Sequence, residues 1–141
     1  MQPLPTTDKG KTILLAEDDG SLRRYATTVL EQHGYVVLAA CDAVDALEIS
    51  ARHPEPIDLL LTDVHLGQGP NGVELANELR KQRRDLAVLV ISGTADGEEL
   101  AGQQGMPFLA KPFKLPALVS RIRDLLAAPP RRDKGCTADG G

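Results

Sequence analysis

The chain has 141 residues, of which 42% are hydrophobic and 26% charged, and this is the composition of an ordinary globular protein with one domain. Its net charge of −4 provides no overall electrostatic footprint for nucleic acid, and an aromatic content of 3% without tryptophan argues against stacked bases or a stacked flavin. The two widely separated cysteines suit a reducing compartment, and no apolar run approaches the roughly 20 residues of a membrane-spanning helix, so we expect a cytoplasmic protein.

The first part of the chain predicts two strand–helix pairs. Residues 12–16 form a short apolar run, which is typical of a strand buried on both faces. A helix follows and ends at Gly34. Its apolar residues, at helical spacing, are Leu22, Tyr25, Ala26, Val29 and Leu30. Residues 35–40 predict a second strand, and Asp42 is the expected N-cap of a second helix. The apolar residues of that helix are Ala43, Val44, Ala46, Leu47 and Ile49.

The second part of the chain predicts three further pairs. Residues 59–63 read Leu-Leu-Leu-Thr-Asp, a buried strand that ends in a carboxylate. After a glycine-rich loop, a third helix is indicated by apolar residues at helical spacing, which are Val73, Leu75, Ala76 and Leu79. The remaining predicted elements are strands at 86–91 and 108–110, a poor helix candidate at 97–104 and an amphipathic helix at 115–126.

A basic cluster closes the third predicted helix. It consists of Arg80, Lys81, Arg83 and Arg84. Positive side chains at this end of a helix interact favourably with the helix dipole. We therefore expect a solvated C-terminal turn rather than a binding patch.

The strict alternation of strands and helices predicts an α/β fold with a parallel sheet covered on both faces. Right-handed crossovers leave few topologies, and the flavodoxin-like, doubly wound strand order 2-1-3-4-5 suits five strands with five helices, the fourth of them short. We expect this domain to span 11–128. Residues 1–10 then form a flexible N-terminal segment, and the charged, glycine-rich residues 129–141 form a disordered tail.

Polar residues stand at the ends of four predicted strands. In the order 2-1-3-4-5, the strands 12–16 and 59–63 are neighbours, so Glu17, Asp18 and Asp63 converge in one crevice. Three carboxylates repel one another unless they are protonated or neutralised. A hard divalent cation with oxygen ligands removes this repulsion, and we expect Mg²⁺, with Mn²⁺ as a possible substitute. The fourth strand delivers the hydroxyl of Ser92, and the fifth delivers the ammonium of Lys111.

These groups are the parts that a phosphoryl acceptor needs. Asp63 would attack phosphorus and form an aspartyl-phosphate. The metal and Lys111 would neutralise the equatorial oxygens, while Ser92 and nearby backbone amides would hydrogen-bond them. Each part alone has an ordinary alternative, as an acidic helix N-terminus, a turn hydroxyl or an exposed lysine. Four such residues at four strand ends are hard to explain together as accidents.

The chain resembles the receiver domain of two-component response regulators over residues 11–127. The stretches that carry the resemblance are Ile13 to Asp19, Leu60 to Val64, Val90 to Gly93 and Lys111 to Phe113. The resemblance implies that Glu17 and Asp18 are the acidic pair, although Asp18 with Asp19 is an alternative register. It further implies that Asp63 is the phosphoacceptor, Ser92 the switch hydroxyl and Lys111 the family's lysine.

The resemblance implies three further features. The backbone carbonyl of His65 would bind the metal, Phe108 would be the switch aromatic, and the Lys111-Pro112 bond would be cis. The chain also departs from the commonest receiver pattern. The loop after Asp63 is a residue longer and has Gly67 where proline is usual, as in receivers attached to hybrid histidine kinases. No output domain is expected after Ala128.

The leading hypothesis is a single-domain response regulator. It would receive a phosphoryl group on Asp63 from a histidine kinase or phosphotransfer protein, and would signal by protein–protein contact through the fourth helix, fifth strand and fifth helix. Nucleic acid and membrane are not expected partners, and the only chemistry expected is magnesium-dependent self-phosphorylation and dephosphorylation. Two alternatives stay open. One is the receiver part of a hybrid histidine kinase, and the other is an aspartate-nucleophile phosphohydrolase, a family that has a second aspartate where His65 stands.

Overall fold

A computed structural model describes residues 10–127, so the predictions for residues 1–9 and 128–141 lie outside the described range. Within this range the strands form one five-stranded parallel sheet in the order β2-β1-β3-β4-β5, which confirms the predicted topology. Strands and helices alternate along the chain as β1 (Thr12–Ala16), α1 (Gly20–Gln32), β2 (Val36–Ala40), α2 (Ala43–Ala51), β3 (Leu59–Asp63), α3 (Gly72–Arg80), β4 (Ala87–Ser92), α4 (Ala95–Gln103), β5 (Phe108–Ala110) and α5 (Leu115–Ala127).

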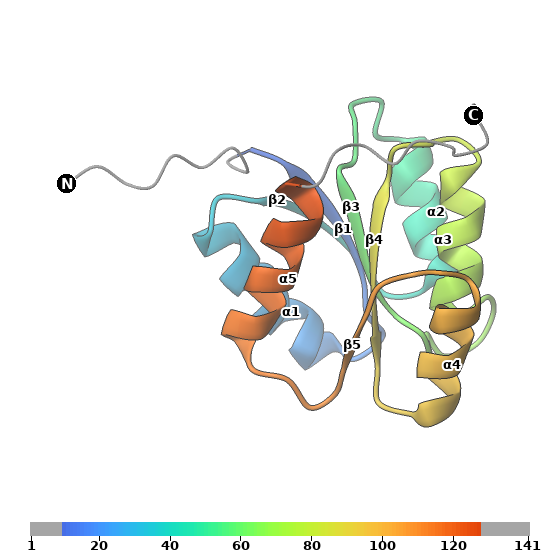
Figure 1. The fold of residues 1–141 in the computed structure, drawn as a ribbon. Coiled ribbons are helices and arrows are strands. Elements are labelled where there is room, and N and C mark those ends of the chain that lie inside the picture. The colour runs from blue at the N-terminus through green and yellow to red at the C-terminus, as the bar shows by residue number, and fades with distance from the viewer. Residues whose placement is uncertain (1–9, 128–141) are drawn as a thin grey trace, which may run out of the picture.

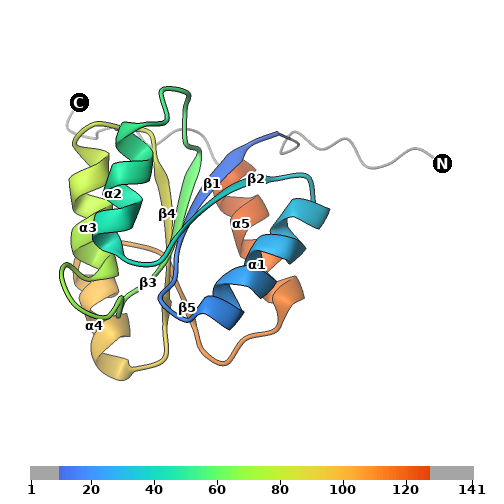
Figure 2. The same ribbon diagram turned by 180° about the vertical axis from the view of Figure 1, so that it is seen from behind.

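The helices cover the sheet in two layers. Figures 1 and 2 show α1 and α5 on one face and α2, α3 and α4 on the other. Successive side chains of a strand point to opposite faces, so the continuous apolar runs of β1 and β3 supply both layers. Leu14 and Leu60 belong to the core beneath α2, α3 and α4, whereas Ile13, Leu59 and Leu61 belong to the core beneath α1 and α5. Among the described residues, no helix is long and apolar enough to cross a membrane.

The strand register brings the predicted polar residues to one edge of the sheet. Ala16 pairs with Thr62, so Glu17 and Asp63 follow at the same level on neighbouring strands. Ser92 is the last residue of β4 and pairs with Ala110, which precedes Lys111. Parallel strands all end at the same edge, and this edge therefore holds the candidate site.

Side-chain caps explain where the helices begin. The carboxylate of Asp42 accepts a hydrogen bond from the backbone N–H of Asp45 at 2.8 Å, which confirms it as the N-cap of α2. Asn71 and Glu74 form a reciprocal capping box at α3. Thr94 caps α4, which begins at Ala95 and so two residues earlier than the sequence predicts. The missed signal is a threonine followed by the acidic residues Asp96 and Glu98 in the first turn.

The basic cluster after α3 corrects a second expectation. The guanidinium of Arg83 donates hydrogen bonds to the carbonyls of Ser50 (3.0 Å), His53 (2.6 Å) and Glu55 (3.0 Å), and to the Ser50 hydroxyl (2.9 Å). A solvated turn was therefore the wrong expectation for Arg83. It binds the C-terminal end of α2, which lies beside α3 on the same face of the sheet. This contact joins segments that are far apart in sequence, and helical periodicity carries no information about it.

Two residues of the predicted apolar faces are exposed. Tyr25 of α1 is 57% exposed, and Val44 of α2 is 53% exposed. The true buried faces of these short helices are narrower, with Ala26 and Leu30 buried in α1 and Ala43 and Ala46 in α2. The apolar residues identified from helical spacing span a wider arc of these helices than the part that packs on the sheet.

Candidate phosphoryl-acceptor site

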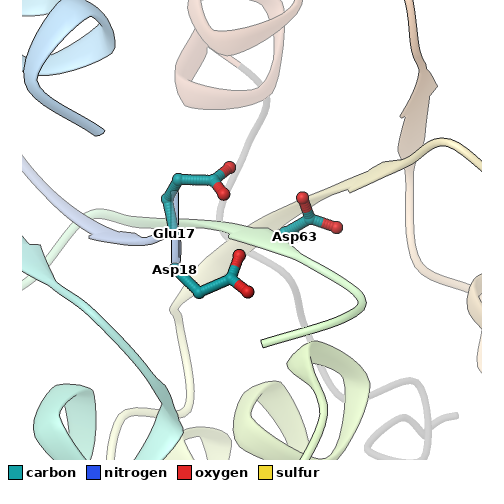
Figure 3. A group of neighbouring side chains, drawn as sticks. All are labelled: Glu17, Asp18 and Asp63. Carbon is teal, nitrogen blue, oxygen red and sulfur yellow. The ribbon is translucent and has the colours of Figure 1, made fainter. Parts of the chain in front are cut away.

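Three carboxylates converge at the carboxyl ends of β1 and β3. One oxygen from each of Glu17, Asp18 and Asp63 lies within 4.8 Å of the other two. Figure 3 shows Glu17 and Asp18 extending from the end of β1 toward Asp63. Glu17 is 3% exposed and Asp63 6%, whereas Asp18 faces solvent. The cluster is thus open on one side and closed beneath.

Asp19 has a different environment from the preceding two acidic residues. Its carboxylate accepts hydrogen bonds from the backbone N–H groups of Ser21 (2.9 Å) and Leu22 (3.1 Å), and it caps the N-terminus of α1. A carboxylate oxygen that caps a helix in this way is directed at the helix N-terminus and not into the crevice between β1 and β3. The structure therefore places Glu17 and Asp18, and not Asp19, beside Asp63.

Lys111 reaches across the site from the end of β5. Its Nζ donates a hydrogen bond to Oδ2 of Asp63 at 2.6 Å. Burial opposes the positive charge, but the hydrogen bond and the charge of Asp63 outweigh it and raise the pKa of Lys111. The charges of Glu17 and Asp18 act in the same direction. Lys111 is therefore held as a cation at the nucleophile candidate.

One ammonium does not balance three carboxylates, and Glu17 shows the consequence. Burial raises the pKa of Glu17 from 4.5 to about 7, and the charge of Asp63 adds to this effect. A hydrogen bond from the backbone N–H of Asp19 (3.1 Å) and the charge of Lys111 act in the opposite direction. Near neutral pH the metal-free cluster therefore holds a proton on Glu17 for part of the time, and a bound cation would take its place.

The hydroxyl of Ser92 is close to the site but is engaged elsewhere. Ser92 is fully buried, and its Oγ donates to the carbonyl of Thr94 (2.8 Å) and accepts from the backbone N–H of Thr94 (3.1 Å). Over residues 10–127 it makes no hydrogen bond to Asp63. The structure thus brings Ser92 to the correct strand end with its hydroxyl bonded to the loop before α4.

His65 lies on the exposed side of the site. Its backbone N–H donates to Oδ1 of Asp63 at 3.2 Å, so the two oxygens of Asp63 are held by two different donors. The His65 ring lies 3.4 Å from the Thr94 hydroxyl, measured from Nε2 to Oγ1. Phe108 is half-buried and packs against the core beneath α2, α3 and α4. The Lys111-Pro112 bond is cis, as the family resemblance implied.

Gly72 is a site-supporting residue that the sequence analysis missed. The hydroxyl of the fully buried Thr62 donates to the carbonyl of Asp63 at 2.9 Å. A Cβ atom on Gly72 would overlap that same carbonyl oxygen and the Thr62 hydroxyl. The first residue of α3 therefore packs directly on the backbone of Asp63. The available signal was a glycine between the cap Asn71 and the apolar face of the helix.

The geometry defines what the site can do chemically. It presents a buried carboxylate whose oxygens are fixed by an ammonium and a backbone amide, next to an acidic pair suited to a cation. A carboxylate held in this way is suited to attack an electrophile that carries anionic oxygens, because the neighbouring Lys111 ammonium offsets their charge.

Comparison with known proteins agrees with this geometry. The family model of the response regulator receiver domain matches residues 13–123. The response regulator receiver protein CpdR of Brucella abortus is 36% identical over 84% of this chain and 98% of its own length. The sensor kinase CckA of the same organism is 32% identical over 82% of this chain, which spans only 12% of that kinase. The chain likewise spans 52% of the regulator PhoB of Pseudomonas aeruginosa, at 34% identity.

Solved structures show the same fold. The non-phosphorylated HemR receiver domain of Leptospira biflexa superposes with a TM-score of 0.74 at 28% identity, covering 87% of this chain and 99% of that domain. The receiver domain of the hybrid histidine kinase CckA superposes with a TM-score of 0.69 at 32% identity, covering 82% of this chain and 98% of that domain. This chain belongs to the receiver-domain family of two-component response regulators.

Proposed function

We propose that this receiver domain accepts a phosphoryl group on Asp63 from the phosphohistidine of a histidine kinase or phosphotransfer protein. The observation that supports the proposal best is the 2.6 Å contact of Lys111 with Asp63 beside the acidic pair. A carboxylate oxygen of Asp63 attacks phosphorus and forms a new O–P bond. The P–N bond of the donor breaks, and its electron pair stays on the imidazole nitrogen. The product is an aspartyl-phosphate.

The donor set of the site fits a magnesium ion. One oxygen from each of the three carboxylates lies within 4.8 Å of the other two, and carboxylate oxygens are the ligands that Mg²⁺ prefers. Glu17, Asp18 and Asp63 would hold the ion, with the backbone carbonyl of His65 as a further ligand. Mn²⁺ shares this preference for carboxylate oxygen. When bound, the ion supplies positive charge that offsets the carboxylates and the incoming phosphoryl oxygens.

Lys111 and Ser92 stabilise the product in this proposal. The Lys111 ammonium already touches the acceptor carboxylate and needs only a small movement to bind a phosphoryl oxygen. Ser92 supplies a hydroxyl donor once its bond to Thr94 is exchanged. Neither residue turns over a substrate, and the chemistry is limited to phosphorylation and dephosphorylation at Asp63. The phosphohydrolase alternative is disfavoured because His65, which occupies the second-aspartate position, is exposed and contacts Thr94.

The output of the domain would be a protein contact. We propose that a downstream protein binds the surface formed by α4, β5 and α5, which connects to the site through Ser92 and Lys111. The net charge of −4 gives no reason to expect DNA binding by this chain, and a cytoplasmic location suits a kinase partner. The similarity to the receiver protein CpdR supports a response-regulator role. The match to the CckA receiver supports a hybrid-kinase receiver as the second candidate.

Intact-mass spectrometry after incubation with acetyl phosphate tests the proposal. Wild type should gain one phosphoryl group in Mg²⁺ and none in chelator, and Asp63→Asn should gain none. Asp124→Asn is the matched control, since Asp124 is an exposed aspartate on α5. Labelling of Asp63→Asn at the wild-type level would show that the acceptor is another residue.

A further inference from the structure

The Ser92 hydroxyl is held by the residues that begin α4. Its single proton is donated to the carbonyl of Thr94, and one of its lone pairs accepts the Thr94 N–H. A hydroxyl has one proton, so Ser92 cannot donate to this carbonyl and to a phosphoryl oxygen at the same time. Ser92 is also fully buried, so bulk solvent does not reach its hydroxyl.

The same carbonyl belongs to the first turn of α4. It accepts the backbone N–H of Glu98 at 3.1 Å in addition to the Ser92 hydroxyl. The side chain of Thr94 accepts the backbone N–H of Gly97 at 3.0 Å and so caps the helix. The orientation of one buried hydroxyl is therefore tied to the start of a helix.

Gly97 provides the space for this arrangement. A Cβ atom at position 97 would overlap Oγ of Ser92 and would lie only 3.1 Å from Oγ1 of Thr94. Gly97 has no left-handed backbone that would require glycine, since positive φ values occur at other glycines. A glycine inside a helix is destabilising by about 0.5–1 kcal/mol relative to alanine. Close packing against Ser92 is therefore the physical reason for glycine here.

We propose that Thr94 and Gly97 are positioning residues that hold the Ser92 hydroxyl away from Asp63 and so set how readily the site takes up a phosphoryl group. We name Ser92, Thr94 and Gly97 the Ser92 latch. The inference rests on the proposed function of Asp63 and adds a determinant of its regulation. The latch is closed when the Ser92 hydroxyl donates its proton to the carbonyl of Thr94, the N-cap of α4. A phosphoryl group on Asp63 competes with the Thr94 carbonyl for that proton.

The latch predicts that adding one methyl group opens it. Gly97→Ala occupies the place of Ser92 Oγ, so the hydroxyl must leave the Thr94 carbonyl before any phosphoryl group arrives. In wild type, binding of beryllofluoride breaks the hydrogen bond from Ser92 to the Thr94 carbonyl, whereas in Gly97→Ala this bond is already broken. The variant should therefore bind beryllofluoride about 5-fold more tightly in Mg²⁺. The rate of phosphorylation by acetyl phosphate should rise in the same direction. Gly102→Ala is the matched control, because a Cβ at position 102 of the same helix meets nothing within 4 Å.

A double-mutant cycle separates the latch from a general effect on stability. Beryllofluoride affinity is measured by ¹⁹F NMR for Gly97→Ala in the wild-type and in the Ser92→Ala background. The gain should be present in the first and absent in the second, because it acts through the hydroxyl. Thr94→Ala, which removes the cap but adds no atoms, should give a gain of the same sign and covers the case in which Gly97→Ala does not fold.

The outcomes distinguish the latch from the proposed function. A wild-type protein that takes up no phosphoryl group contradicts the proposed function itself. Uptake by wild type, with Gly97→Ala and Thr94→Ala both indistinguishable from Gly102→Ala, contradicts the latch alone. An equal gain from Gly97→Ala in the Ser92→Ala background also overturns the latch, since the effect would then be independent of the hydroxyl.

Discussion

The ammonium of Lys111 donates a 2.6 Å hydrogen bond to the carboxylate of Asp63, which closes the site between the ends of β3 and β5. Lys111 is the cation that offsets the repulsion among the three carboxylates. Lys111→Met should therefore lower the free energy of unfolding of the metal-free protein by about 1–3 kcal/mol at pH 8, since one charged partner is left behind. Urea denaturation measures this loss, and Lys114→Met, at an exposed lysine nearby, should change stability little.

The raised pKa of Glu17 makes the stability of the metal-free protein depend on pH. The pKa of Glu17 is about 7 in the folded protein and 4.5 for an unperturbed glutamate, as in the unfolded chain. Between pH 4.5 and pH 7 the folded state therefore keeps a proton that the unfolded state releases. Stability from this group is complete below pH 4.5 and is lost as pH rises through 7. Glu17→Gln removes the slope, and the variant should be more stable than wild type at pH 8 but not at pH 4.5.

The control for this experiment is Glu31→Gln, at an exposed glutamate on α1. It should show the wild-type pH profile. Saturating Mg²⁺ should reverse the order at pH 8, because wild type then gains binding energy that the variant has lost. An unchanged pH slope in Glu17→Gln would show that another group carries the proton.

Magnesium should stabilise the protein through Asp18 and not through Asp19. A ligand that binds only the folded state at 100 times its dissociation constant adds about 2.7 kcal/mol of stability. Asp18→Asn should reduce the rise in melting temperature that Mg²⁺ produces. Asp19→Ala should lower the melting temperature with and without Mg²⁺, because it removes the cap of α1, but should keep the full magnesium response. The reverse pattern would support the alternative register of the acidic pair.

The fold could be predicted because its strands are local apolar runs. β1 and β3 are buried at every position, and their runs were visible as continuous hydrophobic stretches. Strict alternation with helices then left few topologies, so the convergence of Glu17, Asp18 and Asp63 followed from strand order. The fifth strand is only three residues long, and its position could be predicted because Lys111 follows it directly.

Other features depend on contacts between distant segments and could not be predicted from pattern. The rotamer of Ser92 is set by its bonds to Thr94 and by the space at Gly97, neither of which periodicity describes. Met106 is buried beneath α4, although no regular pattern marks it. Arg83 looked like a solvated residue because its partners lie about thirty positions earlier in the chain.

Arg83 should contribute to stability through the end of α2. Its guanidinium holds carbonyls of Ser50, His53 and Glu55, groups that would otherwise need water. Arg83→Met keeps the aliphatic stem and removes the donors, and should lower the free energy of unfolding by about 1–3 kcal/mol. Arg84→Met is the control at an exposed neighbour and should have a small effect. Equal losses in the two variants would assign the effect to net charge.

The contact between Gly72 and the backbone of Asp63 predicts a loss of both stability and phosphorylation. Gly72→Ala places a methyl group on the Asp63 carbonyl and the Thr62 hydroxyl, neither of which is the end of a flexible side chain. Overpacking of this kind costs about 1–3 kcal/mol. The start of α3 and the end of β3 must move apart at Asp63, so phosphorylation by acetyl phosphate should also become slower.

Gly102→Ala provides the opposite expectation for the same change of residue type. Position 102 is an exposed helical glycine with open space around it, so alanine should raise the free energy of unfolding by about 0.5–1 kcal/mol. Urea denaturation and acetyl phosphate labelling of the two variants, side by side, separate helix propensity from packing. A Gly72→Ala variant as stable and as readily labelled as Gly102→Ala would mean that α3 does not support the position of Asp63.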